Sequence, residues 1–191
     1  MSDSERKPNT VFVNLWGGPG TSKSTNAAFV FATLKRLSYN AELIAEYAKK
    51  KVWGNEMKTL GHQLYVTAKQ THAQFNLLGE VEVAVTDSPI LLGPLIYPGF
   101  GSTPSFLPYM KEVFAQFNNL NIFLTRNPDW HPYNPKGRTQ TEHEAMALDV
   151  ELRRLMAVHE IEFEEMMVGP DVVDNIVSRV VKKIEESRSE G

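Results

Sequence analysis

A stretch near the start of the chain has the spacing of a phosphate-binding loop. Residues 17–25 read GGPGTSKST, which follows the pattern G-x-x-x-x-G-K-S/T except that Ser22 replaces its second glycine. A polyphosphate needs converging backbone N–H groups, a mobile positive charge and a hydroxyl for Mg²⁺. Lys23 is expected to reach the outer phosphates of ATP and Ser24 to bind Mg²⁺. The residues expected to surround the nucleotide are Gly17, Gly18, Pro19, Gly20, Thr21, Ser22, Lys23, Ser24 and Thr25.

Ser22 stands where glycine would tolerate positive φ and close backbone approach. If this position is left-handed, the serine Cβ costs about 1–2 kcal/mol. If the position is helical, that cost disappears and the hydroxyl adds a hydrogen-bond donor. In both cases we expect nucleotide binding to survive, because a triphosphate accepts several charge-assisted hydrogen bonds. The alternative is a glycine turn that only joins a strand to a helix.

Two carboxylates follow predicted strands. Asp87 comes directly after the apolar run 81–86, where P-loop proteins place the acidic residue that anchors Mg²⁺. Glu46 follows the second predicted strand and is a candidate to orient or deprotonate an acceptor hydroxyl. The alternatives are an ordinary strand-ending aspartate and a first-turn acid favoured by the helix dipole.

Basic residues border a proline-rich segment, residues 126–139, which is expected to act as a lid over the site. Arg126 ends a predicted strand, and Lys136 and Arg138 lie at the far side of the segment NPDWHPYNPKGR. Phosphoryl transfer requires cations that neutralise charge on the transferring oxygens, and a closing lid excludes water. Arg126 and Arg138 are therefore predicted catalytic residues. The alternative is a surface loop with solvated charges.

Three further groups carry weaker indications. The cluster Lys49, Lys50 and Lys51 suits acceptor phosphates, although a charge run is more often a solvated helix face. Gln63 and Gln70 are seven residues apart, so their amides share a helix face that could contact a base edge. The five histidines lack metal-ligand spacing and are expected to be polar or packing residues; they are His62, His72, His131, His143 and His159.

Alternating apolar patterns predict the elements that position these residues. Strands are expected over 10–16, 41–45, 81–86, 121–125 and 162–168. Helices are expected over 24–37, 46–78 with interruptions near Gly54 and Gly61, 104–118, from a Thr141/Glu144 capping box to about His159, and from Asp171 onward. Alternating strands and helices predict a parallel sheet covered on both faces, with ligands beyond the strands' carboxyl ends.

Composition sets outer limits on function. The 191 residues, 42% hydrophobic and 23% charged, fit one domain over 10–186 with flexible tails at 1–9 and 187–191. Neither a signal peptide nor a membrane-spanning run is present, so a cytoplasmic protein is expected. The absence of cysteine excludes disulfides and zinc sites built on sulfur. A net charge of -3 means that nucleic-acid contact would need a local basic patch.

Five stretches together resemble a known family: GGPGTSKST, ELIAEYAKKKVW, QLYVTAKQ, VTDSP and YNPKGRTQTEHEA. They are similar to P-loop kinase-like proteins of tailed bacteriophages, usually labelled ATPases, over nearly all the chain between the tails. Within that family the chain looks like the kinases that phosphorylate 5-hydroxymethyluracil in phage DNA. The resemblance implies a P-loop NTPase fold of the nucleotide-kinase type with a lid, and an infected host cell as its setting. It also implies ATP and Mg²⁺ binding by Lys23 and Ser24, an acidic centre at Asp87, and lid arginines at Arg126 and Arg138.

Three functions follow from these observations. A phosphotransferase acting on hydroxymethylated pyrimidine in DNA needs a groove for a strand and an extruded base. A nucleoside or nucleoside monophosphate kinase needs a closed pocket instead. An NTPase switch would lack an acceptor pocket and use nucleotide to order a partner surface. The acidic composition favours the second function, the resemblance favours the first, and the proline-rich segment disfavours the third.

Overall fold

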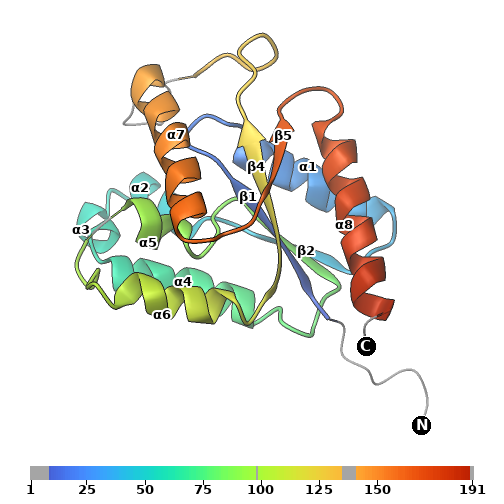
Figure 1. Cartoon of the computed structure of the whole chain (residues 1–191), viewed down its shortest axis with the longest axis horizontal. Coiled ribbons are helices and arrows are strands. Elements are labelled where there is room, and N and C mark those ends of the chain that lie inside the picture. The colour runs from blue at the N-terminus through green and yellow to red at the C-terminus, as the bar shows by residue number, and fades with distance from the viewer. Residues whose placement is uncertain (1–8, 98, 135–140, 190–191) are drawn as a thin grey trace.

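The computed structural model describes residues 9–97, 99–134 and 141–189, and within them five strands form one parallel sheet in the order β2-β3-β1-β4-β5 (Figure 1). The strands are β1 (Val11–Trp16), β2 (Ala41–Ile44), β3 (Val83–Thr86), β4 (Asn118–Thr125) and β5 (Glu164–Met167). β1 is central, and its Val13 lies in register with Val85 of β3 and Leu120 of β4. All of β1 is buried, because both faces of a parallel sheet are covered by helices.

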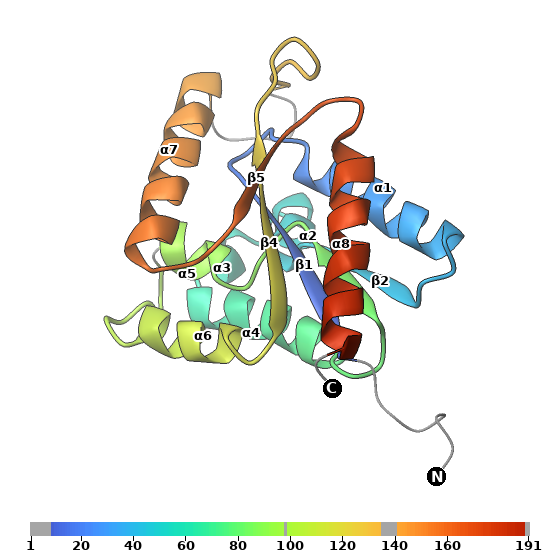
Figure 2. The ribbon, with the colours of Figure 1, turned by 45° about the vertical axis from the view of Figure 1, so that its right-hand side comes forward.

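Helices cover the two faces of the sheet, as predicted. They are α1 (Lys23–Arg36), α2 (Tyr47–Trp53), α3 (Met57–Leu60), α4 (Gln63–Phe75), α5 (Leu92–Ile96), α6 (Phe106–Phe114), α7 (Glu142–Val158) and α8 (Val172–Ser189). Figure 2 shows α1 and α8 on one side and α4, α6 and α7 on the other. None of the described helices is long and apolar enough to cross a membrane.

Alternate residues of β1 enter two separate apolar cores. Val11, Val13 and Leu15 pack with residues of α1 and α8. Phe12 and Trp16 face the opposite side, where the core includes residues of α6 and α7. This alternation follows from the two-residue period of a strand. Each fully buried apolar side chain contributes about 1.5–3 kcal/mol, so β1 anchors both layers.

An asparagine cluster joins the middle of β1 to the first half of β4. Asn14 Nδ2 donates to Asn119 Oδ1 at 2.9 Å and to Asn121 Oδ1 at 3.1 Å. Trp16 Nε1 also donates to Asn121 Oδ1 at 3.1 Å. These bonds pair the buried Asn14 amide with two half-buried asparagines of β4, and the strands lie in register from Val11 with Asn118 to Trp16 with Phe123.

Several boundaries differ from the sequence expectations. β4 begins at Asn118 instead of residue 121, because its asparagines are paired within the sheet despite their low strand propensity. The expected helix over 104–118 ends at Phe114. The short helix α5 was not predicted. α8 continues through Ser189, into the segment expected to be a flexible tail.

The capping box at the start of α7 is confirmed. Thr141 Oγ1 accepts from the Glu144 backbone N–H, and the Glu144 carboxylate accepts from the Thr141 backbone N–H at 2.7 Å. The interruptions expected near Gly54 and Gly61 are also present, and they separate α2, α3 and α4.

Candidate functional site

The loop between β1 and α1, called the phosphate loop after its sequence motif, contains two glycines with positive φ. Gly17 and Gly20 have φ values of 137° and 86°, a region that side chains rarely occupy. Lys23 is the first residue of α1. Its Nζ donates to the carbonyl oxygens of Gly17 at 2.7 Å and Gly18 at 2.8 Å, so the lysine lies back across the loop.

Ser22 takes the left-handed conformation, one of the two that the sequence left open. It is the N-cap of α1, with φ 58° and ψ 22°, and its side chain makes no capping hydrogen bond. Its Oγ is buried and has no hydrogen-bond partner among the described residues. Ser22 therefore carries both the Cβ cost of a left-handed residue and the cost of a buried, unpaired hydroxyl.

Three carboxylates surround the Lys23 ammonium. Burial lowers the pKa of Lys23 to about 8, and the carboxylates of Glu46, Asp87 and Asp149 oppose this lowering. The Arg126 guanidinium lowers the pKa further. With a pKa of about 8, the lysine is mostly protonated at pH 7 and loses its charge at mildly alkaline pH, and bound phosphates would favour its protonated form.

A cavity of about 260 Å³ lies on one side of the phosphate loop, and its lining includes Lys49, Lys50 and Trp53. It brings together Ser24, Glu46 and Asp87 from the ends of three separate stretches of chain, as expected for the carboxyl edge of a parallel sheet. The lining is completed by Ala27, Leu43 and Ala45.

Glu46 is one of two acidic residues that line this cavity. It is the N-cap of α2, yet its carboxylate makes no capping hydrogen bond. Burial, and second the nearby Asp87 carboxylate, raise the pKa of Glu46. Asp87 itself is buried. A carboxylate with a raised pKa beside a second acid is the environment that general bases occupy in many enzymes.

Gln70 fixes the chain segments that carry these two acids. Its Oε1 accepts from the backbone N–H of Tyr47 at 3.2 Å, and its Nε2 lies 3.4 Å from Thr86 Oγ1. Tyr47 follows Glu46, and Thr86 precedes Asp87. Gln63 and Gln70 do share a face of α4, but both are buried. The Gln70 amide is bonded within the protein, so it is not free for the base-edge contact that the sequence left possible.

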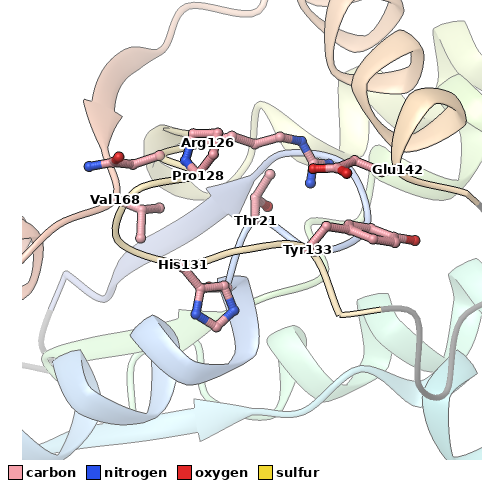
Figure 3. Close-up of a pocket in the computed structure, with 10 residues that line it drawn as sticks. Thr21, Arg126, Pro128, His131, Tyr133, Glu142 and Val168 are labelled. Carbon is pink, nitrogen blue, oxygen red and sulfur yellow. The ribbon is translucent and has the colours of Figure 1, made fainter.

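A second pocket is lined by Gly20, Thr21 and Ser22 of the phosphate loop (Figure 3). Arg126, His131 and Tyr133 reach it from the segment after β4, and Val168 reaches it from the end of β5. A Cβ added to Gly20 would lie 2.9 Å from the Tyr133 ring, so the ring packs directly on the loop. Of the predicted lid residues, Lys136 and Arg138 lie outside the described part of the chain.

Arg126 is held in place by Asp149 of α7, a residue that sequence reasoning missed. Arg126 Nε donates to the Asp149 carboxylate, and Nη2 donates to the carbonyl oxygens of Pro19 at 2.6 Å and Ala145 at 3.3 Å. The other Asp149 oxygen accepts from the Gly18 backbone N–H at 2.5 Å. Asp149 lies on the buried face of α7, between positions filled by Ala145, Leu152 and Met156. A charged residue on an otherwise apolar helix face was the available indication.

No family model matches the chain, and no curated protein matches it by sequence. Among solved structures it is similar to thymidylate kinase from Ehrlichia chaffeensis, at 14% identity and a TM-score of 0.60, over 92% of this chain and 98% of that one. The chain therefore shares the fold of this kinase. Shikimate kinase from Bacteroides thetaiotaomicron also matches, at 14% identity and the same coverage of 92% and 98%, with a TM-score of 0.47.

In this P-loop kinase fold, the residues available to hold Mg²⁺ are few. Within the described ranges no group of three or more His, Asp or Glu side chains is placed to bind a metal ion. Mg²⁺ typically binds one or two protein oxygens together with phosphate and water oxygens. Ser24 and Asp87, which line one cavity, fit that requirement.

Proposed function

We propose that this protein is an ATP-dependent kinase that transfers the γ-phosphoryl group to a hydroxyl of a nucleotide-type acceptor, with 5-hydroxymethyluracil in DNA as its specific acceptor. The observation that carries the proposal is the cavity beside the phosphate loop. Ser24 of the loop shares it with two acidic side chains, Glu46 and Asp87. An acceptor in this cavity would meet the phosphates and a general base together, whereas an NTPase switch needs no such pocket.

Each residue of the site has a role in this reaction. The backbone N–H groups of the loop and Lys23 would bind the ATP phosphates. Mg²⁺, held by Ser24 and Asp87, would neutralise charge on those phosphates. The acceptor oxygen attacks the γ-phosphorus, the bond to the ADP oxygen breaks, and Glu46 takes the hydroxyl proton. Arg126, at the other side of the loop, would stabilise the charge that develops on the transferring group.

The mouth of the cavity supports a nucleotide-type acceptor. Lys49 and Lys50 are exposed there and supply positive charge for an acceptor phosphate. Trp53, 77% exposed, offers an aromatic surface on which a base can stack. The specific base rests on the resemblance to phage kinases, and on this proposal the protein acts in the cytoplasm of an infected host cell. A nucleoside or nucleoside monophosphate kinase is the alternative that the same cavity supports.

The test follows the label from γ-labelled ATP. The protein is incubated with 5-hydroxymethyluracil DNA, plain DNA, each deoxynucleoside and each monophosphate. Label in the modified DNA alone supports the specific proposal, and label only in small molecules supports the alternative. Label found only as free phosphate would exclude a kinase. Lys23→Ala should abolish transfer, while Lys35→Ala, which removes an exposed lysine from the same helix, should not.

A further inference from the structure

The buried carboxylate of Asp149 connects α7 to both the phosphate loop and Arg126. We propose that Asp149 is a positioning residue, which holds Arg126 and the first turn of the loop in the arrangement needed for phosphoryl transfer. The inference rests on the proposed kinase function, but its geometric part can be tested without nucleotide. Asp149 is outside the loop motif, in a helix that begins more than a hundred residues later in the chain.

Both oxygens of Asp149 are used, one for each partner. Oδ1 accepts from the Gly18 backbone N–H at 2.5 Å, and Oδ2 accepts from Arg126 Nε. Asp149 is 6% exposed, and the Arg126 side chain is 16% exposed. A pair this buried is tolerated only when each charge is paired and hydrogen-bonded. Removal of the carboxylate would therefore leave a half-buried guanidinium without its charged partner.

The contacts of Arg126 fix the plane of its guanidinium. Asp149 holds Nε, while the carbonyl oxygens of Pro19 and Ala145 hold Nη2. Nη1 remains on the side of the loop, since a Cβ added to Gly20 would lie 3.1 Å from it. A guanidinium is planar, so fixing two of its nitrogens also fixes the direction of the third. Asp149 thus determines where Arg126 presents its remaining donors.

Gly18 shows how closely α7 approaches the loop. A Cβ at this position would lie 2.6 Å from Asp149 Oδ1 and 3.0 Å from the Ala145 carbonyl oxygen. Gly18 does not have positive φ, so its lack of a side chain serves this contact and not a special backbone conformation. The phosphate loop and α7 are therefore in direct contact, and Asp149 lies at the centre of this contact.

A positioning role and a merely structural role predict different kinetics. Asp149→Asn keeps an oxygen for Gly18 N–H but loses the charge that orients Arg126. We expect kcat to fall at least tenfold while the Kd for ATP, measured by calorimetry, changes less than threefold. Asp149→Ala loses both contacts, so ATP binding should weaken as well, and backbone hydrogen exchange over residues 17–20 should rise in the nucleotide-free protein. Glu151→Gln, on an exposed face of α7 where Glu151 pairs with Arg154, is the matched control.

A double-mutant cycle isolates the partnership with Arg126. Once Arg126→Ala has removed the guanidinium, adding Asp149→Asn should lower kcat by less than threefold further. Arg126→Lys should resemble Arg126→Ala, because lysine cannot hold the same planar set of bonds. This variant also tests the inference if Asp149→Asn fails to fold.

Several results would overturn the inference. One is an Asp149→Asn protein with lower thermal stability but kcat within twofold of wild type. Another is a double mutant whose loss equals the product of the two single losses. If wild type binds ATP but transfers no label, the kinase proposal fails separately. In that case, unchanged hydrogen exchange over residues 17–20 in Asp149→Ala would overturn the loop contact, and raised exchange would support it.

Discussion

The left-handed Ser22 predicts that Ser22→Gly makes the nucleotide-free protein more stable. Three contributions set the size of the effect. Relief of the Cβ strain contributes about 1–2 kcal/mol. Removal of a buried hydroxyl without a partner contributes about 1–3 kcal/mol. The greater freedom of glycine in the unfolded chain opposes these by about 0.4–1 kcal/mol.

The net gain should be about 3 kcal/mol, which corresponds to about 6–12 °C in Tm for a domain of this size. The assay is urea unfolding of the nucleotide-free protein with linear extrapolation of the free energy of unfolding. Ser22 is the N-cap of α1 at φ 58°, a position set by the strand and helix on either side, so the same relief is expected with and without ATP. We therefore expect the Kd for ATP to change much less than the stability does.

Two control variants separate the contributions. Ser22→Ala removes the hydroxyl but keeps the Cβ, so it should gain the hydroxyl contribution alone. Ser38 is also left-handed, at φ 68°, but it is exposed. Ser38→Gly should therefore gain about 0.5–1 kcal/mol, the backbone contribution after the glycine penalty. The reasoning is refuted if Ser22→Gly leaves the free energy of unfolding unchanged while Ser38→Gly raises it.

Three other changes have defined outcomes. The pKa of Lys23, about 8, predicts that the Kd for ATP rises as pH increases above 8, because the lysine of the free protein loses its proton. Calorimetry at a series of pH values should show this rise for wild type and not for Lys23→Arg. Glu46→Gln should lower kcat by about 10²–10⁴-fold. Glu46→Gln should also raise Tm at pH 7, because the raised pKa of Glu46 means that its ionised form destabilises the fold. The gain in Tm should shrink as pH falls through the pKa of Glu46 in the folded protein and vanish below its pKa in the unfolded chain. A gain in Tm that stays constant with pH would contradict this reasoning. Gly18→Ala should weaken ATP binding by displacing Asp149, and normal binding by this variant would show that α7 can move away.

The sequence was sufficient to predict the positions that follow directly from strand ends. Ser24, Glu46 and Asp87 were expected at the carboxyl edge of a parallel sheet, and they line one cavity there. Their catalytic and metal-binding roles stay predictions. The loop conformation at Ser22 could not be predicted, because serine is compatible with both backbone regions and only the surrounding turn selects one.

Contacts between distant segments were beyond sequence reasoning. Asp149 meets Gly18 across 131 positions of chain, and neither residue's local pattern specifies the other. Gln70 shows a second limit of sequence reasoning. Its face of α4 was identified correctly, but a helix face that carries amides can point into the protein when backbone N–H groups and hydroxyls there need partners. Periodicity gives the face and does not give its direction.

The asparagine cluster between β1 and β4 has a consequence for the geometry of catalysis. The phosphate loop follows β1, and Arg126 follows β4. The register of these two strands therefore sets the position of Arg126 relative to the phosphate loop along the strand direction. A slip by one residue would shift Arg126 by about 3.3 Å along the sheet, more than the 2.6 Å that separates its Nη2 from the Pro19 carbonyl oxygen. The same slip would separate the buried Asn14 amide from Asn119 and Asn121, and an unpaired buried amide makes the slipped register unfavourable. The asparagine bonds between β1 and β4 therefore fix the distance between the phosphate loop and Arg126.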